Sequence, residues 1–318
     1  MTSKTYAGID LGSNSCKLLI CDETGKHLCL KNYPTRLAEG MYENNKLTQE
    51  AIDRGLQCFF EYRQLLDKYG VDPQNMRAIT TAACRMAENG AEFVKKVYAE
   101  SRIKLEIIDG LEEAKLNLKG AMEHVVGTSK YVIIYDLGGG STEITLATNE
   151  KNPEIIRSVS IPWGARNSSE AFSLVEYSEV NADKLKNEIN KYLDDFVGGI
   201  DLTEYEDVCF VATSSTPLRL VSMINDFGNY DREKADGLMM TVSQMDEAID
   251  SLLKSSREEL AANPYIGDKR SYIFIAACII FKQIYDRLKI KKLTASLKSA
   301  KDGIVAILME RNNNAQVD

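Results

Sequence analysis

A repeated seven-residue motif constrains this chain more than any other feature of its 318 residues. Residues 9–15 read IDLGSNS and residues 135–141 read YDLGGGS, so that Asp, Leu, Gly and the final Ser coincide at an offset of 126 residues. In both copies an apolar segment runs into the Asp, and a second segment rich in apolar residues follows the Ser. A repeat of this length indicates a duplicated domain rather than a solenoid of short units. The motif therefore predicts two related halves.

The composition of the two loops suits them to a phosphate group. A short loop rich in Gly and Ser lets backbone N–H groups converge on an anion without hindrance from Cβ atoms, and its hydroxyls add donors. The Asp before each loop cannot bind phosphate, but it suits a hydrated Mg²⁺ ion or the positioning of a water molecule. One loop alone could be an ordinary hairpin turn, whereas two matched loops favour a two-sided clamp on a phosphate chain.

The hydrophobic pattern predicts similar elements in both halves, with each half opening on a meander of three strands. Strands are expected at 5–11, 15–21, 27–33, 76–80 and 103–108, and then at 131–137, 143–148, 155–161, 208–212 and 292–297. Helices are expected at 48–69, 91–100, 111–126, 179–196, 242–261, 270–288 and 298–311. We therefore predict an α/β protein with one domain over residues 1–126 and a second over 127–297. The last helix is expected to pack back on the first domain.

Composition excludes several classes of function. The net charge of −8 argues against non-specific nucleic-acid binding, and no apolar run approaches the roughly 18–20 residues of a membrane span. Seven scattered cysteines without a Cys-x-x-Cys pair, and only two histidines, argue against a zinc site or a disulfide framework. Free thiols, and an N-terminus that enters a strand at once, predict a cytoplasmic protein without a signal peptide. A homodimer is compatible with the sequence.

A basic stretch near the C-terminus has two interpretations, a solvated helix face and turn or a track for an extended polyphosphate. Its members are Lys282, Arg287, Lys289, Lys291, Lys292, Lys298 and Lys301. The overall negative charge does not decide between them, because the local field counts for more than the sum.

Five segments, in this order, resemble the exopolyphosphatase and guanosine pentaphosphate phosphatase family of the actin, Hsp70 and sugar-kinase superfamily. They are GIDLGSNSCKLLI (8–20), TTAACRMAEN (80–89), IIDGLEEAKLNLKGAM (107–122), YDLGGGSTEI (135–144) and VATSSTPLRL (211–220). Looser echoes are PTRLAEGM (34–41), PWGARNS (162–168) and SLKSAKDGIVAIL (296–308). The resemblance implies duplicated actin-like (ribonuclease H-like) domains with mixed five-stranded sheets flanked by helices, and a ligand cleft between them. It also implies the short, two-domain form of the family.

The resemblance further implies hydrolysis of the terminal phosphoryl group of inorganic polyphosphate or guanosine pentaphosphate. Glu113, the second Glu of the Glu-Glu-Ala segment, matches the residue that would activate or orient the water, and Glu112 is its near alternative. Without the resemblance, both could simply be carboxylates favoured at a helix N-terminus. Arg85 matches an Arg that would neutralise charge on the phosphoryl group, although it could also form a surface ion pair.

Oxygen ligands imply Mg²⁺, with Mn²⁺ as an alternative. Asp10 and Asp136 would hold the ion directly or through water, and Glu143 would join them. Lys17 and Arg166 are weaker candidates for outer phosphate contacts. The expected phosphate-binding residues are Gly12, Ser13, Asn14 and Ser15 in the first loop, and Gly138, Gly139, Gly140, Ser141 and Thr142 in the second.

One segment departs from the family pattern. Residues 212–216 read ATSST where relatives usually have Gly-Thr-Ser-Gly-Thr, so both glycines are lost and the loop is expected to be shaped differently. This change keeps open a non-catalytic sensor of guanosine tetra- or pentaphosphate, or of polyphosphate. An ATP-dependent small-molecule kinase is a further alternative, disfavoured because no glycine here would admit adenine closely. An actin-like filament protein is the last alternative, and nothing in the sequence calls for it.

Overall fold

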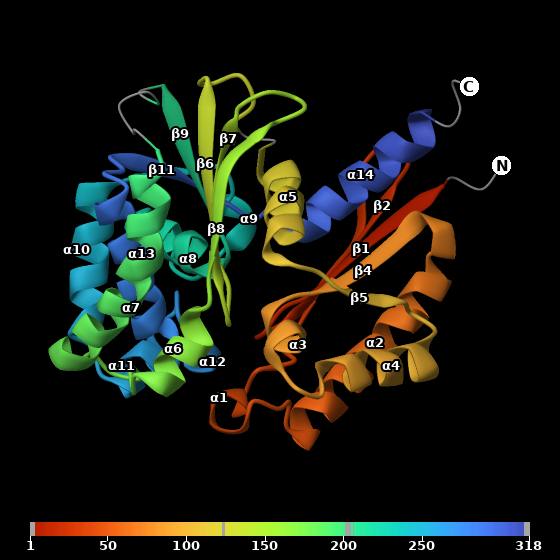
Figure 1. The fold of residues 1–318 in the computed structure, drawn as a ribbon, viewed down its shortest axis with the longest axis horizontal. Coiled ribbons are helices and arrows are strands. Elements are labelled where there is room, and N and C mark those ends of the chain that lie inside the picture. The colour runs from red at the N-terminus through yellow and green to blue at the C-terminus, as the bar shows by residue number, and fades with distance from the viewer. Residues whose placement is uncertain (1–3, 123–124, 201–204, 206, 315–318) are drawn as a thin grey trace. The chain divides into compact units, whose positions relative to one another are not determined.

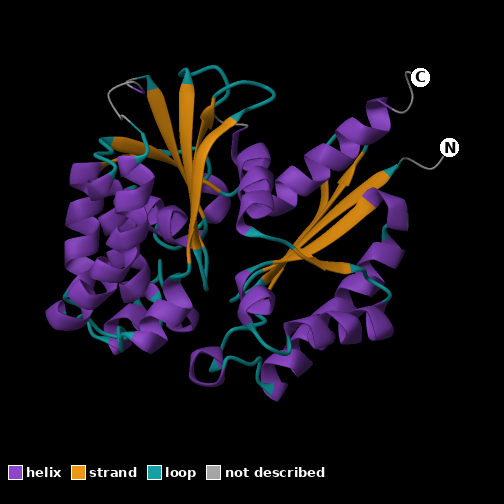
Figure 2. Cartoon of the chain, in the orientation of Figure 1, coloured by secondary structure: helices purple, strands orange, loops and turns teal. Residues whose placement is uncertain are grey.

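The structure of the protein is a computed structural model that describes residues 4–122, 125–200, 205 and 207–314. Its packing divides the chain into two units. The first consists of Met1–Gly120 with Lys298–Asp318, and the second of Ala121–Leu297. The division falls inside the helix expected at 111–126, of which positions 123 and 124 lie outside the described residues. Each unit is a sheet with helices packed against it (Figures 1 and 2).

The sheet of the first unit has five strands in the order β3-β2-β1-β4-β5. They are β1 (Thr5–Leu11), β2 (Cys16–Asp22), β3 (His27–Tyr33), β4 (Met76–Thr80) and β5 (Leu105–Ile107). The first three pair antiparallel as a meander, and β4 and β5 run parallel to β1. Because the parallel strands end together, the end of β1 lies beside the end of β4, with Leu11 opposite Thr80.

Helices cover both faces of this sheet. They are α1 (Met41–Asn44), α2 (Gln49–Lys68), α3 (Ala82–Met86), α4 (Gly90–Ser101), α5 (Gly110–Ala121) and α14 (Ala300–Asn314), with a 3₁₀ turn at Pro73–Asn75. Figure 1 shows α2 and α4 on one face of the sheet and α5 and α14 on the other. Helix α2 begins where expected, because the Thr48 hydroxyl caps it by accepting a hydrogen bond from the Ala51 N–H.

Three glycines allow α14 to lie unusually close to α5 and β1. A Cβ atom at Gly303 would lie 2.0 Å from the Leu116 carbonyl oxygen, and one at Gly120 would lie 2.2 Å from that of Ser299. A Cβ atom at Gly8 would lie 2.5 Å from the Lys301 carbonyl oxygen. Backbone therefore packs on backbone at these points, which fixes the start of α14 against the first strand and against α5.

The sheet of the second unit has six strands in the order β10-β11-β9-β6-β7-β8. They are β6 (Tyr131–Leu137), β7 (Thr142–Thr148), β8 (Ile155–Ile161), β9 (Val208–Thr213), β10 (Met239–Thr241) and β11 (Lys292–Ser296). The antiparallel meander β6-β7-β8, with β9 parallel to β6, repeats the arrangement of the first unit. The expectation of five strands misses β10, because three residues are too few to show an alternating pattern.

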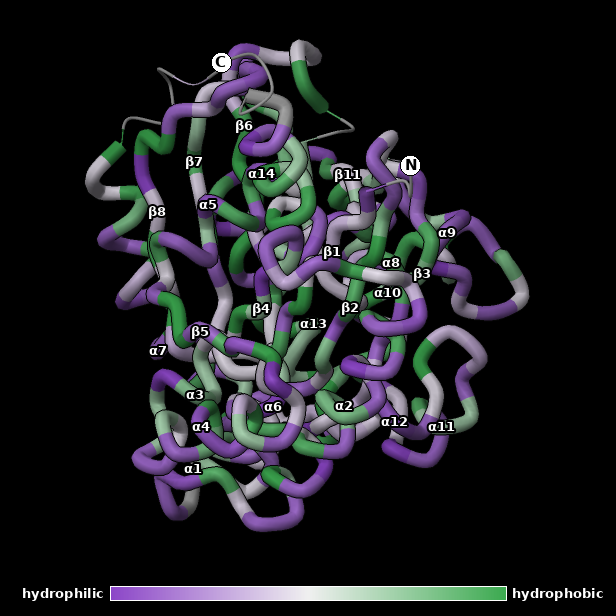
Figure 3. Tube along the Cα trace, turned by 90° about the vertical axis from the view of Figure 1, so that its right-hand side faces the viewer, coloured by the Kyte–Doolittle hydropathy of each residue, from purple (hydrophilic) through white to green (hydrophobic). Residues whose placement is uncertain are grey.

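The second unit is rich in helices. They are α6 (Ala165–Ala171), α7 (Glu179–Gly198), α8 (Ser215–Ile224), α9 (Arg232–Ala235), α10 (Val242–Leu253), α11 (Arg257–Ala262), α12 (Asp268–Ser271) and α13 (Phe274–Arg287). Apolar residues concentrate on the strands and on helices such as α13, which runs through the core (Figure 3). The single helix expected at 242–261 is two, because Ser256 caps a new one by accepting from the Glu259 N–H. The helix expected at 270–288 is likewise divided.

Candidate active site

The two repeated loops close with the same hydrogen bond. Gly12 N–H donates to the Ser15 carbonyl at 3.0 Å, and Gly138 N–H donates to the Ser141 carbonyl at 3.0 Å. Each loop joins the first two strands of its meander, β1 to β2 and β6 to β7. The sequence repeat is therefore a structural repeat as well, with equivalent atoms in equivalent roles.

A segment that follows the third strand supports the loop in each unit. In the first, the carbonyls of Ser13 and Asn14 accept hydrogen bonds from the N–H groups of Ala38 and Arg36, both at 3.0 Å. In the second, the carbonyls of Gly138 and Gly139 accept from the N–H groups of Ala165 (2.9 Å) and Arg166 (2.8 Å). Because these carbonyls accept hydrogen bonds from the supporting segments, the negative ends of the peptide dipoles in each loop are fixed in position.

Two residues of the second supporting segment have specific roles. The Asn167 side-chain amide donates to the Gly140 carbonyl at 3.0 Å, while its oxygen accepts from the Gly164 N–H at 2.8 Å. A Cβ atom at Gly164 would lie 2.6 Å from the Gly139 carbonyl carbon, so a larger residue would displace the loop. Sequence reasoning noted the PWGARNS segment as an echo of the family but assigned these two residues no role.

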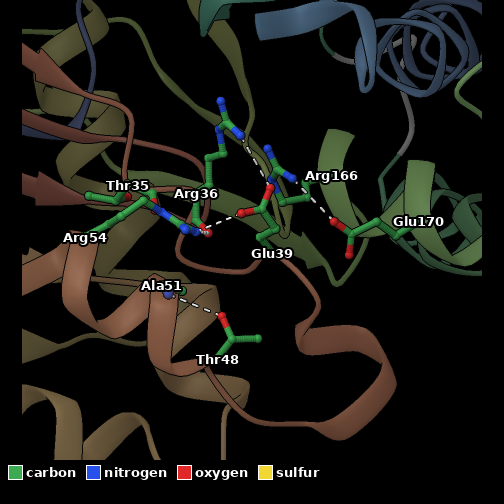
Figure 4. Close-up of polar contacts among 8 residues, drawn as sticks. All are labelled: Thr35, Arg36, Glu39, Thr48, Ala51, Arg54, Arg166 and Glu170. Atoms are coloured by element: carbon green, nitrogen blue, oxygen red, sulfur yellow. Dashed lines mark hydrogen bonds and ion pairs between the residues drawn. The ribbon is translucent and has the colours of Figure 1, made fainter.

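Charged side chains reinforce these supporting segments (Figure 4). In the first unit, Arg54 donates to the Thr35 carbonyl at 2.8 Å and pairs with Glu39 at 2.8 Å. Glu39 also lies 3.6 Å from Arg36. In the second unit, Arg166 is buried and its Nη1 lies 3.4 Å from Glu170 Oε1.

Two of the predicted metal ligands stand side by side in the second unit. Asp136 on β6 is opposite Glu143 on β7, which is opposite Ser160 on β8, so all three side chains lie on one face of the sheet. Glu143 is buried, and its Oε1 accepts a hydrogen bond from Ser160 Oγ at 3.0 Å. Two neighbouring carboxylates suit a Mg²⁺ ion that keeps most of its water. The described residues contain no group of three or more candidate metal ligands, so water and substrate would complete the shell.

The equivalent place in the first unit is different in charge. Lys17 occupies the position that Glu143 has in the repeat, opposite Asp10, and its Nζ lies 3.5 Å from Asp10 Oδ2. Asp10 thus already has a cation beside it, whereas Asp136 has a second carboxylate. The donor set of the second unit fits a divalent cation better than that of the first, and Asp10 stays a prediction as a metal ligand.

The sequence gives no sign that Lys301, near Asp10, is buried. Lys301, in the first turn of α14, is only 3% exposed, and its Nζ lies 2.6 Å from Asp302 Oδ2. Burial lowers the pKa of Lys301 below its ordinary value, the charge of Asp302 opposes this, and Lys17 lowers the pKa further. The sequence placed Lys301 in a basic stretch, either solvated or forming a polyphosphate track.

The structure also divides that basic stretch. Lys298 and Lys301 belong to the first unit, and the other members belong to the second. Lys282 pairs with Asp246, and Arg287 pairs with Asp194. Lys282 and Arg287 therefore have carboxylate partners within the second unit, and the polyphosphate track stays a prediction.

The two candidate bases, Glu112 and Glu113, lie in different surroundings although they are adjacent. Asp109 starts α5 by accepting from the Glu112 N–H with its side chain at 2.8 Å. Glu113 is 7% exposed, and its Oε2 lies 3.5 Å from Arg85 Nη1. Arg85 also donates to the Ile108 carbonyl at 2.7 Å, which holds its guanidinium at the start of α5.

Glu112 instead belongs to an ion-pair network on the outer surface of β4 and β5. Its Oε1 lies 2.9 Å from Arg77 Nη1, and Arg77 also pairs with Glu106 at 3.2 Å. Burial alone would lower the pKa of Arg77, but its hydrogen bond to Glu112 and the charge of Glu106 raise it above its ordinary value. The geometry therefore favours Glu113 over Glu112 as a base.

The altered segment 212–216 stands next to Asp136. Thr213 ends β9 opposite Asp136, and Ser214 follows with φ 91° and ψ 178°, a conformation that favours glycine. The hydroxyls of Thr213 and Ser214 are buried and have no hydrogen-bond partner among the described residues. The strain sits at Ser214, one residue before the position of the second lost glycine, because α8 begins at once with Ser215.

Comparison with known proteins supplies the family. The model of the Ppx/GppA phosphatase family matches residues 23–312. The chain belongs to the Ppx/GppA phosphatase family. It is also 30% identical over 296 residues to a bifunctional 3-dehydroquinate synthase/phosphatase of Fusobacterium nucleatum subsp. nucleatum. That match covers 88% of this chain but 43% of the relative, so the chain spans less than half of the relative's length.

Solved structures of this family share the fold. An exopolyphosphatase-like protein superposes with a TM-score of 0.89 at 22% identity, covering 97% of this chain and 99% of that one. An exopolyphosphatase from Cytophaga hutchinsonii gives 0.87 at 22% identity, with 97% and 98% covered. The Ppx/GppA family member from Aquifex aeolicus gives 0.78 at 23% identity, with 98% of both chains covered. The predicted duplicated actin-like fold is therefore confirmed, with six strands rather than five in the second sheet.

No helix among the described residues is both long enough and apolar enough to span a membrane. Membership of a phosphatase family supports a hydrolase, in agreement with the reaction class inferred from the sequence.

Proposed function

We propose that this chain hydrolyses the terminal phosphoanhydride bond of inorganic polyphosphate, of guanosine pentaphosphate, or of both. The observation that carries the proposal is the buried Glu113 carboxylate, 3.5 Å from the Arg85 guanidinium at the start of α5. A base and a cation so arranged are what an in-line attack of water on a phosphoryl group requires. The exopolyphosphatases among the solved structures agree with this substrate class.

In the proposed reaction, Glu113 orients a water molecule and accepts one of its protons as the water oxygen bonds to the terminal phosphorus. The bond from that phosphorus to the bridging oxygen breaks, and its electron pair stays with the shortened chain. The products are orthophosphate and a ligand with one phosphate fewer. Arg85 stabilises the charge on the equatorial oxygens in the transition state, a role for which a guanidinium fork is suited.

The repeated loops hold the phosphates in this proposal. The Gly12 and Gly138 N–H groups close the loops, and the Thr142 hydroxyl donates to the Trp163 carbonyl at 2.7 Å. The remaining N–H groups and hydroxyls of the two loops donate to phosphate oxygens, and the supporting segments keep the loops from relaxing. Asn167 contributes to this rigidity through the Gly140 carbonyl. Preorganised donors of this kind lower the barrier because they need not reorient during the reaction.

Asp136 and Glu143 would hold Mg²⁺ or Mn²⁺, and Ser160 would orient the Glu143 carboxylate by the hydrogen bond it donates. A divalent ion bound there would neutralise charge on the phosphate oxygens. The two carboxylates fit such an ion because hard cations take oxygen ligands, and Mg²⁺ is commonly bound through one or two carboxylates plus substrate phosphates.

The deciding experiment measures phosphate release from medium-chain polyphosphate and from guanosine pentaphosphate, side by side, with Mg²⁺. Glu113→Gln should lower kcat by about 10²–10⁴-fold on the preferred substrate. Glu112→Gln is the matched control, because it removes the neighbouring carboxylate and only a surface ion pair, so release should largely survive. Absence of release by the folded parent protein, with both ligands still bound, would contradict the catalytic proposal and favour a sensor of the same ligands.

A further inference from the structure

Asn117, in the middle of α5, is a polar residue buried in an unusual way. It is 2% exposed, and neither its Nδ2 nor its Oδ1 has a hydrogen-bond partner among the described residues. A side-chain amide offers two donors and an acceptor with two lone pairs. Burying all of them without hydrogen bonds is costly, so we expect a further polar group to pair with this amide.

The helix places this amide next to Glu113. Residues four apart in an α-helix lie on the same face, with their Cβ atoms about 5–6 Å apart. The Cα–Cβ bonds of a helix tilt toward its N-terminus, so the Asn117 side chain extends over the turn that carries Glu113. Both residues are buried, and no hydrogen bond joins the two side chains directly. A water molecule spans a separation of this size between polar groups.

Ser299, just before α14, brings a second buried polar group to the same side of α5. A Cβ atom at Gly120, three residues after Asn117, would lie 2.2 Å from the Ser299 carbonyl oxygen. Ser299 is 2% exposed, and its Oγ also has no hydrogen-bond partner within the part of the chain that the structure describes. Its N–H donates to Asp302 Oδ2 at 2.8 Å, which fixes its backbone at the start of α14. All these residues belong to the first unit.

Packing alone does not require an amide at this position. The residues on either side, Leu116 and Leu118, are buried leucines, and leucine has the same branched outline as asparagine. A leucine at position 117 would fill the space without the cost of an unpaired amide. Buried water typically makes about three hydrogen bonds to otherwise unpaired polar groups. Suitable partners are present here in the Asn117 amide, the Ser299 hydroxyl and the Glu113 carboxylate.

We propose that Asn117 is a positioning residue for the hydrolysis and that it acts through Glu113. Asn117 and Ser299 hold buried water against the Glu113 carboxylate, and this water donates a hydrogen bond to the carboxylate. The hydrogen bond restricts rotation of the carboxylate, so that Glu113 meets the attacking water in one orientation. The inference rests on the proposed function and adds the residues that keep its base in place.

The experiment compares thermal unfolding and phosphate release in variants of Asn117 that separate packing from hydrogen bonding. Asn117→Leu keeps the branched shape but removes the amide, so it should unfold at the same or a higher temperature and lower kcat at least about tenfold on the preferred substrate. Asn117→Ser leaves a smaller side chain that still binds water, so it should be less stable than Asn117→Leu but retain more activity. A merely structural role predicts the opposite order of kcat, because activity would then follow stability.

A double-variant cycle tests whether Asn117 acts through Glu113. In a Glu113→Gln background, Asn117→Leu should change kcat by less than about twofold, and an undiminished loss in that background would refute the positioning role. Ser299→Ala leaves α5 intact and should lower kcat less than Asn117→Leu does. If neither Asn117 variant folds, Ser299→Ala decides, and a rate within about twofold of the parent would then overturn the inference.

Tyr135→Phe is the matched control, because the Tyr135 hydroxyl is likewise buried without a partner among the described residues. It lies in the second unit, on the opposite face of β6 from Asp136, with its ring centroid 5.4 Å from that of Phe281. Its removal should leave kcat unchanged. If folded Asn117→Leu releases phosphate within about twofold of the parent, the inference is refuted and the proposed function stands. If the parent releases no phosphate, both are refuted.

Discussion

Arg85 Nη1 lies 3.5 Å from Glu113 Oε2, and the same nitrogen donates to the Ile108 carbonyl at 2.7 Å. The carbonyl thus fixes the guanidinium and leaves the Glu113 carboxylate as its ionic partner at the start of α5. In the proposed reaction, this arrangement would provide, within one unit of the chain, a carboxylate that orients water and a cation that binds the phosphoryl group.

Replacement of Arg85 should be severe for catalysis and mild for stability. Arg85→Lys keeps the charge but loses the fork, and we expect kcat to fall by about 10²-fold or more. Initial rates of phosphate release test this. Arg77→Lys is the control, since Arg77 serves the surface network of Glu112 and Glu106, and a comparable loss there would show that Arg85 has no special role.

The carboxylates of the second unit should determine the concentration of divalent cation that activity requires. Glu143→Gln should raise the Mg²⁺ concentration needed for half-maximal activity by about 10–100-fold, and Ser160→Ala should raise it less, because Ser160 only orients the carboxylate. A Mg²⁺ titration of activity measures both. The exposed Glu154, on the loop before β8, is the control, and equal effects at 143 and 154 would argue against this site.

Replacement of Ser214 by glycine should stabilise the folded protein. Its φ of 91° is costly for any residue with a Cβ atom, so Ser214→Gly should raise the free energy of unfolding by about 1 kcal/mol. Denaturant unfolding measures the change, with Ser255→Gly as a control at a half-buried bend where φ is not positive. A lower stability of Ser214→Gly would mean that the buried hydroxyl is worth more than the strain.

Gly303 should tolerate no side chain. Its Cβ would lie 2.0 Å from the Leu116 carbonyl, so Gly303→Ala should push α14 away from α5 and cost about 1–3 kcal/mol. Gly198→Ala is the contrast, because nothing lies within 4 Å of that position on α7 and alanine favours helices. If both variants kept their stability in urea unfolding, the close backbone packing would be refuted.

Lys301 should give stability a distinctive dependence on pH. Its pKa is lower in the folded state than in the unfolded chain, so between these two values the unfolded chain binds more protons. Stability relative to Lys301→Met should therefore rise with pH through the folded pKa and level off above the ordinary lysine pKa. Unfolding measured from pH 7 to 11 tests this, with the exposed Lys95→Met as control. A flat difference would contradict the buried state of Lys301.

The sequence by itself was informative wherever short-range pattern decides the structure. Strands 76–80, 131–137 and 155–161 occur as predicted, because alternating apolar residues between turn signals specify a strand locally. The two repeated loops could be predicted for the same reason, because the spacing of Gly and Ser specifies a tight turn within a few residues. The very short β10 and the break between α10 and α11 could not be predicted from the sequence. A three-residue strand and a single capping residue change the hydrophobic pattern too little to be recognised.

Only the tertiary structure determined which residues far apart in the chain lie next to one another. Adjacent glutamates look alike in the sequence, yet Glu113 is buried beside Arg85 while Glu112 pairs with Arg77. Lys301 looked like one more basic residue until close glycine packing placed it in the interior. Burial, charge and pKa depend on neighbours brought in by folding, so no local pattern could separate these residues.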